Sequence, residues 1–128
     1  MTIARCFAFI GPYLNLDIHF AIGNFIRDGI LKQPIIVQGD GTPLRSYLYG
    51  SDLAVWLWTI LLRGKTGQAY NVGSDEEISI GELAKRVSTC FVEPSEVIVH
   101  QSPDPGSLAR RYVPCIEKAK KELGLQCW

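Results

Sequence analysis

The sequence has neither an excess of charge of one sign nor a long hydrophobic run. Its 13 Lys and Arg residues balance its 13 Asp and Glu residues, so the formal net charge is zero, which argues against general nucleic-acid binding. The longest uncharged apolar run, Leu53–Leu62, is much shorter than the roughly 18 residues that suggest a membrane span. Arg5 interrupts the apolar start of the chain, so no signal-peptide pattern is present. We therefore expect a soluble, cytoplasmic protein that does not bind a membrane.

The cysteines show no metal-binding pattern. The four cysteines are Cys6, Cys90, Cys115 and Cys127, and none of them is paired at the short separations typical of zinc sites. Cys6 lies in a strand-like apolar run, where we expect it to be a small buried apolar group. The pattern favours a reducing compartment. A secreted, disulfide-bonded protein is the alternative, and nothing else in the sequence supports it.

No glycine-rich dinucleotide-binding turn and no Tyr-x-x-x-Lys pair occurs in these residues. What is present is a polar glycine turn, Gly39-Asp40-Gly41, which leads to Arg45, and an asparagine, Asn71, at a strand end. Arginine offers a planar fork of donors and asparagine adds a neutral donor, so together they suit a diphosphate. From local sequence alone, Arg45 is as readily a solvated turn residue, and Asn71 as readily satisfies backbone groups. We interpret Asp40 as a turn residue and His19 as an ordinary histidine without a catalytic role.

The hydrophobic pattern predicts one globular α/β domain. Hydrophobic residues make up 47% and charged residues 20% of the 128 residues, which is globular composition. Strands alternating with helices indicate an α/β architecture. The strands are expected at 2–10, 35–37, 46–49, 69–72 and 97–99, and the helices at 17–31, 51–63, 80–91 and 115–123.

Several residues should begin or end these helices. Ser79 and Glu82 form a capping box, Ser51 or Asp52 is expected to cap the second helix, and Gly64 to end it in the left-handed conformation. Gly124 should close the last helix. The second helix is apolar nearly all round, so it should need more covering chain than these residues supply.

The order of these pieces resembles the carboxy-terminal part of extended short-chain dehydrogenases/reductases, the NAD-dependent nucleotide-sugar epimerase/dehydratase family. The matching segments cover essentially the whole chain: Ala4–Phe7 with Gly11-Pro12, Gly39–Arg45, Tyr47–Ala54, Tyr70–Gly73, Arg111–Pro114 and Lys121–Gly124. The resemblance implies a fragment of a Rossmann-type fold, mostly the small substrate-binding domain. Residues 1–12 and 48–64 would belong to the edge of a dinucleotide-binding domain that lies mainly outside this chain.

The resemblance also implies a set of substrate-binding residues. It places the phosphate-binding arginine on Arg45, the asparagine after the strand tyrosine on Asn71, and a second arginine on Arg111. Tyr47 is a candidate to face the sugar, although alternating strand packing explains it equally well. Arg45 and Asn71 are expected to converge on one pyrophosphate. No catalytic residue of the family falls within the chain.

Three positions depart from the family pattern. Ala8 replaces an asparagine near the substrate, and Cys115 replaces the aspartate that usually precedes the last helix. Gln38 stands where related dehydratases tend to carry an aromatic residue against the base, so we expect it to contact the base by hydrogen bonds rather than by stacking.

The resemblance therefore implies the nucleotide-sugar-binding part of an NAD-dependent epimerase/dehydratase. NAD or NADP would bind the intact parent and not this chain alone, so the chain alone should be inactive. The expected partners are a nucleoside-diphosphate sugar, the missing amino-terminal half and further copies of the chain. The alternatives are a non-catalytic regulatory or interaction module of the same fold, and a domain that binds another anionic ligand.

Overall fold

The computed structural model describes residues 1–18 and 20–128, and it divides them into two compact units. The first unit comprises Met1–Pro12, Ser46–Glu77 and Tyr112–Trp128, and the second comprises Tyr13–Arg45 and Ile78–Arg111. The sequence suggested one ordinary domain, whereas the structure has two units whose segments alternate along the chain. His19, which we interpreted as an ordinary histidine, lies outside the described residues.

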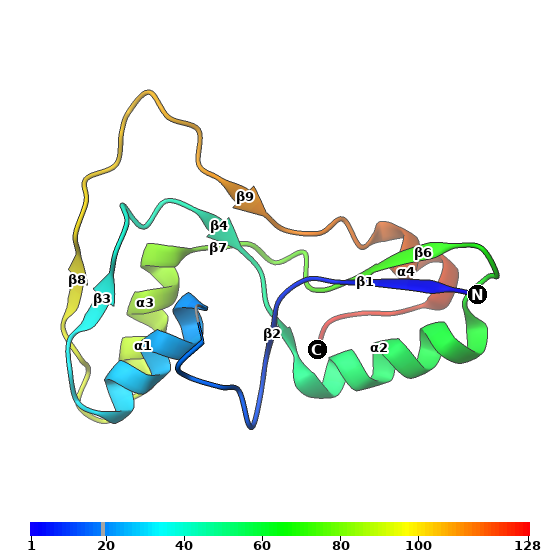
Figure 1. Ribbon diagram of the computed structural model, residues 1–128, viewed down its shortest axis with the longest axis horizontal. Coiled ribbons are helices and arrows are strands. Elements are labelled where there is room, and N and C mark those ends of the chain that lie inside the picture. The colour runs from blue at the N-terminus through cyan, green and yellow to red at the C-terminus, as the bar shows by residue number, and fades with distance from the viewer. Residues whose placement is uncertain (19) are drawn as a thin grey trace. The chain divides into compact units, whose positions relative to one another are not determined.

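The first unit is built on short parallel strand pairs covered by helices. Strand β1 pairs in parallel with β6 over four positions, and β2 pairs with β5 over two. The core lies between α2, α4 and β6, with Trp56 and Tyr70 as its largest members (Figure 1). The elements are β1 Ile3–Cys6, β2 Phe9–Ile10, β5 Leu48–Tyr49, α2 Gly50–Arg63, β6 Ala69–Val72 and α4 Glu117–Leu123.

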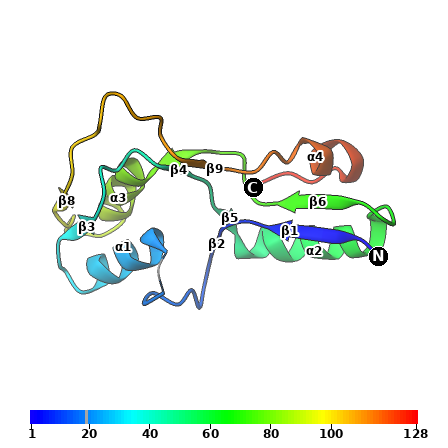
Figure 2. The same ribbon diagram turned by 45° about the horizontal axis from the view of Figure 1, so that its top comes forward.

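The second unit packs two helices against a parallel strand pair and adds a small three-stranded sheet. Strands β3 and β8 pair in parallel, while β4 lies between β7 and β9. Helices α1 and α3 pack against each other and against β3, burying Phe25, Ile35 and Ala84 (Figure 2). The elements are α1 Ala21–Ile30, β3 Ile35–Val37, β4 Leu44–Arg45, β7 Ile78–Ser79, α3 Ile80–Thr89 and β8 Val97–Val99. Strand β9, Arg111–Tyr112, begins in this unit, and its second residue is assigned to the first unit.

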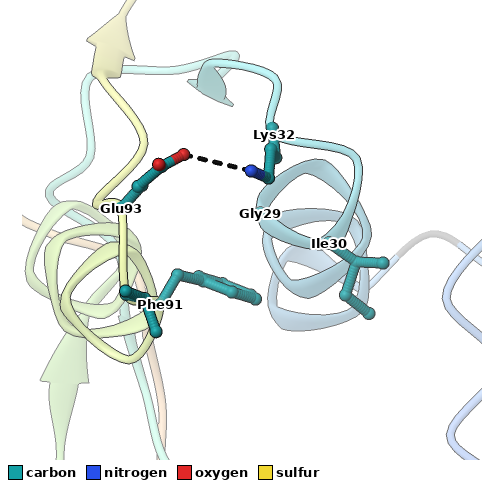
Figure 3. A pocket seen from close by; sticks show the side chains of 6 residues that line it. Gly29, Ile30, Lys32, Phe91 and Glu93 are labelled. Carbon is teal, nitrogen blue, oxygen red and sulfur yellow. Dashed lines mark hydrogen bonds and ion pairs between the residues drawn. The ribbon is translucent and has the colours of Figure 1, made fainter.

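A close contact joins the ends of α1 and α3 in the second unit. The Phe91 ring lies against the backbone of Gly29, so a Cβ atom at that position would come within 2.1 Å of the ring. Lys32 Nζ and Glu93 Oε2 form an ion pair of 3.1 Å beside a cavity of about 220 Å³ (Figure 3). A larger residue at position 29 would therefore displace the aromatic ring, and no turn is involved.

The predicted α/β class is confirmed, but the first strand is shorter than predicted. The structure has β1 and β2 in place of one strand over 2–10, because the chain changes its pairing partner. The Phe7 amide donates to Val72 O, whereas Ala8 O accepts from the Leu48 amide, each at 3.0 Å. The prediction that Cys6 is buried is wrong: all of β1 is exposed, because within the unit β1 pairs on one side only.

The other strands at 35–37, 69–72 and 97–99 match β3, β6 and β8. Of the predicted strand 46–49, only Leu48–Tyr49 is a strand, β5, and the separate strand β4 lies before it at Leu44–Arg45. Helix α1 begins at Ala21, later than predicted, and before it the Asn15 side chain accepts from the Asp17 amide. Helix α4 begins at Glu117, and no side chain caps it.

The cap predictions are partly confirmed. Ser79 Oγ accepts from the Glu82 amide at 3.1 Å, while the Glu82 carboxylate accepts from Lys85 Nζ. Gly124 closes α4, as predicted, and its conformation is left-handed, with φ 69°. The prediction for Gly64 is wrong, since its φ is −65°; a Cβ there would lie 2.4 Å from Ile60 O, so the residue is small because of close approach.

The cap prediction for α2 is also wrong. Tyr49 stands at its N-cap without a side-chain hydrogen bond, and the Asp52 carboxylate instead accepts from the Trp128 amide at 3.1 Å. Within residues 1–18 and 20–128, no helix has the length and apolarity needed to cross a bilayer.

Helix α2 is apolar on two faces, and the unit covers one of them. Trp56 and Ile60 are buried, whereas Trp58, Leu61 and Leu62 are 63%, 69% and 75% exposed. The expectation that this helix lacks covering chain is therefore confirmed for these residues. A contiguous apolar face of this kind favours association.

We expect the chain to associate through the exposed face of α2. Replacing Leu61 with glutamate should lower the average mass at high concentration, because a charge on this face opposes the burial of its neighbours. Sedimentation equilibrium measures this mass. Arg63→Glu, a change on an already polar position of the same helix, is the control. A wild-type chain that stays monomeric at every concentration would contradict the expectation.

The stability of the first unit should fall in acid because of Glu122. Its carboxylate accepts from the Tyr70 hydroxyl at 2.9 Å and pairs with Lys65 Nζ at 3.3 Å, and these contacts lower the pKa of Glu122. A carboxylate with a lowered pKa stabilises the fold above its unfolded pKa, near 4.3, and loses this effect as pH falls through the folded pKa. Urea unfolding between pH 3 and pH 7 should show a shallower acid decline for Glu122→Gln than for the wild type. Glu117→Gln, on the same helix, is the control.

Candidate functional site

The glycine turn before β4 is held by a side chain. The Asp40 carboxylate accepts from the Thr42 amide at 3.0 Å and from Thr42 Oγ1 at 2.9 Å. These hydrogen bonds lower the pKa of Asp40, because they favour the charged form. The carboxylate is thus engaged in the turn, as the sequence indicated. Among the described residues, no group of three or more His, Cys, Asp or Glu side chains could hold a metal ion.

The same turn is fixed by backbone bonds to the start of α3. Gly41 O accepts from the Gly81 amide at 2.9 Å, and Pro43 O accepts from the Ile80 amide at 3.0 Å. Gly41 has φ +76°, and a Cβ there would lie 3.2 Å from the Gly81 Cα. The turn therefore requires glycine both for its conformation and for its close approach to α3.

Arg45 ends β4 with one side of its guanidinium occupied. Nη1 donates to Leu44 O at 2.8 Å and to Arg110 O at 3.3 Å. Among residues 1–18 and 20–128, no hydrogen bond or ion pair engages its Nε or Nη2. Since a guanidinium carries five N–H donors, three remain for a ligand. The side chain is half-buried, so its position is restrained without being closed off.

Gln38 is exposed and lines a cavity of about 330 Å³ at the edge of β3, whose wall has both polar and apolar side chains. Arg27, which also lines it, is paired with Asp28 at 2.9 Å and with Asp17 at 3.6 Å. The positive charge of Arg27 is thus neutralised. Apart from Arg27 and Asp28, the polar side chains that line the cavity are carboxamides, which carry no net charge. The lining residues are Asn24, Arg27, Asp28, Gln33, Pro34, Ile36 and Gln38.

Asn71 lies in β6 of the first unit, and its Nδ2 donates to Cys115 O at 2.9 Å. This bond is the backbone-satisfying role that the sequence left open as the alternative to ligand binding. Tyr47 also belongs to the first unit, whereas Arg45, Arg111 and Gln38 belong to the second. The expected convergence of Arg45 and Asn71 stays a prediction.

Sequence reasoning missed two parts of the second unit. The carboxamides of Asn24 and Gln33 join the Gln38 cavity because α1 packs on β3, and no motif marks them. Arg110 contributes its carbonyl to Arg45, a role that is independent of its side chain. No sequence signal announces a backbone acceptor.

Comparison with known proteins identifies the family of this chain. The model of the NAD dependent epimerase/dehydratase family matches residues 1–73, more than half of the chain. The chain belongs to this family. It is 34% identical over 125 residues to UDP-glucuronic acid decarboxylase 6 of Arabidopsis thaliana, covering 97% of the chain and 35% of that protein.

Solved structures show the same fold. Pal from Bacillus thuringiensis is 25% identical with a TM-score of 0.82, over 99% of this chain and 40% of that one. The Bordetella bronchiseptica enzyme WbmF, solved in complex with NADH, is 22% identical with a TM-score of 0.83, over 98% of this chain and 40% of that one. The chain thus spans about a third of the curated relative and two fifths of these structures.

The glycine turn at residues 39–41 does not fit the dinucleotide that the family name implies. In a dinucleotide-binding turn, the glycines lead from a strand into a helix whose N-terminus binds the pyrophosphate. Here Gly39 and Gly41 lead into strand β4, and the first amides of α3 are taken by Gly41 O and Pro43 O. Neither this glycine turn nor the start of α3 is thus arranged to hold the pyrophosphate of a dinucleotide.

Replacing Gly41 with alanine should destabilise the second unit by about 1–2 kcal/mol, because a Cβ is strained at positive φ and meets Gly81. Gly39→Ala is the matched control, since a Cβ there has no atom within 4 Å. Urea unfolding followed by circular dichroism measures the difference. Equal stability of the two variants would contradict the close approach described above.

Proposed function

We propose that this chain is the nucleotide-sugar-binding part of an NAD-dependent enzyme that acts on a UDP-sugar. The support comes from family membership and from the similarity to a UDP-glucuronic acid decarboxylase over nearly the whole chain. The parent would carry out decarboxylation, epimerisation or dehydration of the sugar. This part would contribute binding energy from the phosphates, which orients the sugar for reaction.

The observation that carries the proposal is the state of Arg45. Its Nη1 is satisfied by two carbonyls, and its other three donors have no partner among the described residues. A planar edge with parallel N–H groups matches two phosphate oxygens, and such charge-assisted pairs are stronger than neutral ones. Arg45 is therefore proposed to bind the diphosphate.

Gln38 is proposed to contact the base. Its cavity presents the carboxamides of Asn24, Gln33 and Gln38, and its one arginine is already paired with carboxylates. Carboxamides can donate and accept, as the edge of a pyrimidine requires. The cavity therefore suits a neutral polar group better than a phosphate.

The remaining assignments rest on family resemblance. We propose that Arg111 contacts the diphosphate and that Tyr47 and Asn71 line the sugar site. Residues 1–12 and 48–64 are proposed to belong to the edge of a dinucleotide-binding domain, whose other parts would bind NAD or NADP. Without those other parts of the dinucleotide-binding domain, the chain should show no turnover. The parent is proposed to be a cytoplasmic homo-oligomer.

A second candidate is a non-catalytic module of the same fold. Such a module would keep the diphosphate site. Measurable turnover of a nucleotide sugar by the chain with added NAD would contradict both the inactivity of the chain and this candidate.

Calorimetric titration of the chain with UDP tests the phosphate site. Arg45→Ala should weaken binding about 10- to 100-fold, since a hydrogen-bonded charged contact contributes about 1.5–3 kcal/mol. Arg86→Ala is the matched control, because Arg86 is an exposed arginine on α3 of the same unit. Unchanged affinity of Arg45→Ala for UDP, or equal loss in both variants, would overturn the assignment.

A further inference from the structure

Taking the proposed diphosphate site as its basis, we propose that the backbone carbonyl of Arg110 positions Arg45 so that a diphosphate binds to the Nε–Nη2 edge of the guanidinium. Arg110 is thus a positioning residue that acts through its main chain. As a consequence, diphosphate binding and the pairing of β9 with β4 strengthen each other.

One edge of the Arg45 guanidinium is open to a ligand. A guanidinium can meet two oxygens through Nη1 with Nη2, or through Nε with Nη2. The two N–H groups of Nη1 match the two carbonyls that accept from it, Leu44 O and Arg110 O. An anion at the Nη1–Nη2 edge would have to displace a carbonyl. The Nε–Nη2 edge can bind without losing either bond.

The carbonyl oxygen of Arg110 accepts two hydrogen bonds. Arg110 O accepts from the Leu44 amide at 2.9 Å and from Arg45 Nη1 at 3.3 Å. The first bond pairs β9 with β4, and the second restrains the arginine side chain. Because one oxygen with two lone pairs serves both, the side-chain restraint depends on the strand pairing.

Strand β9 is held by few buried contacts. Strand β9 is two residues long, and every residue from 101 to 110 before it is exposed. Few buried contacts therefore oppose its local opening. A ligand that holds Arg45 in its restrained position must stabilise the paired state of β9 by the same factor by which pairing favours the ligand.

The test uses the isotope-labelled full chain with and without saturating UDP. We expect the Nε and Nη2 resonances of Arg45 to shift on binding while those of Nη1 stay in place. Hydrogen exchange of the Leu44 amide should slow at least about fivefold more than exchange of the Ile80 amide, given typical coupling between sites. Ile80 is the internal control, because its amide bonds to Pro43 O and not to β9.

Arg45→Lys separates charge from geometry. A lysine keeps the charge but offers no planar edge, so UDP should bind more weakly and should no longer slow Leu44 relative to Ile80. A shift confined to Nη1, or equal slowing of both amides in the wild type, would overturn the inference. In that case the proposed function would still stand, provided that Arg45→Ala weakens UDP binding about 10- to 100-fold. If Arg45→Ala binds UDP as tightly as the wild type does, both the inference and the proposed function are overturned.

Discussion

The backbone hydrogen bonds of residues 41–44 are the constraint on which the candidate site depends. Gly41 O and Pro43 O receive the first amides of α3, and the Leu44 amide donates to Arg110 O. Three segments that are distant in sequence are thereby joined at one short stretch. Arg45 follows directly, so its guanidinium is placed by main-chain geometry rather than by other charged side chains.

In the first unit, side-chain contacts hold helix α4 over the buried Tyr70. Tyr70 is fully buried beneath α4, and its hydroxyl joins Glu122 to the loop after α2 through hydrogen bonds. Lys118 lies over the Tyr70 ring at 4.8 Å and donates to Ala69 O, while Lys120 pairs with Asp75. Two lysines of α4 thus tie that helix to the rest of the unit.

Much of the fold was predictable because hydrophobic spacing reports burial directly. The patterns over 35–37 and 69–72 identified β3 and β6, and the serine before α3 identified its cap. Errors arose where a partner distant in sequence decides the outcome. The break after Cys6 depends on which strand pairs with Phe7 and Ala8, and Gly64 is glycine because Ile60 and Thr2 approach it.

The sequence by itself determined the α/β class, the helix and strand periods and the residues that carry the family resemblance, including Arg45. These follow from local spacing and side-chain chemistry, which are written into consecutive residues. Only the tertiary structure decided which donors of Arg45 are occupied and which carboxamides share the Gln38 cavity. Both depend on which backbone carbonyls and helix faces are brought together by the packing of distant segments, and a linear pattern does not encode that.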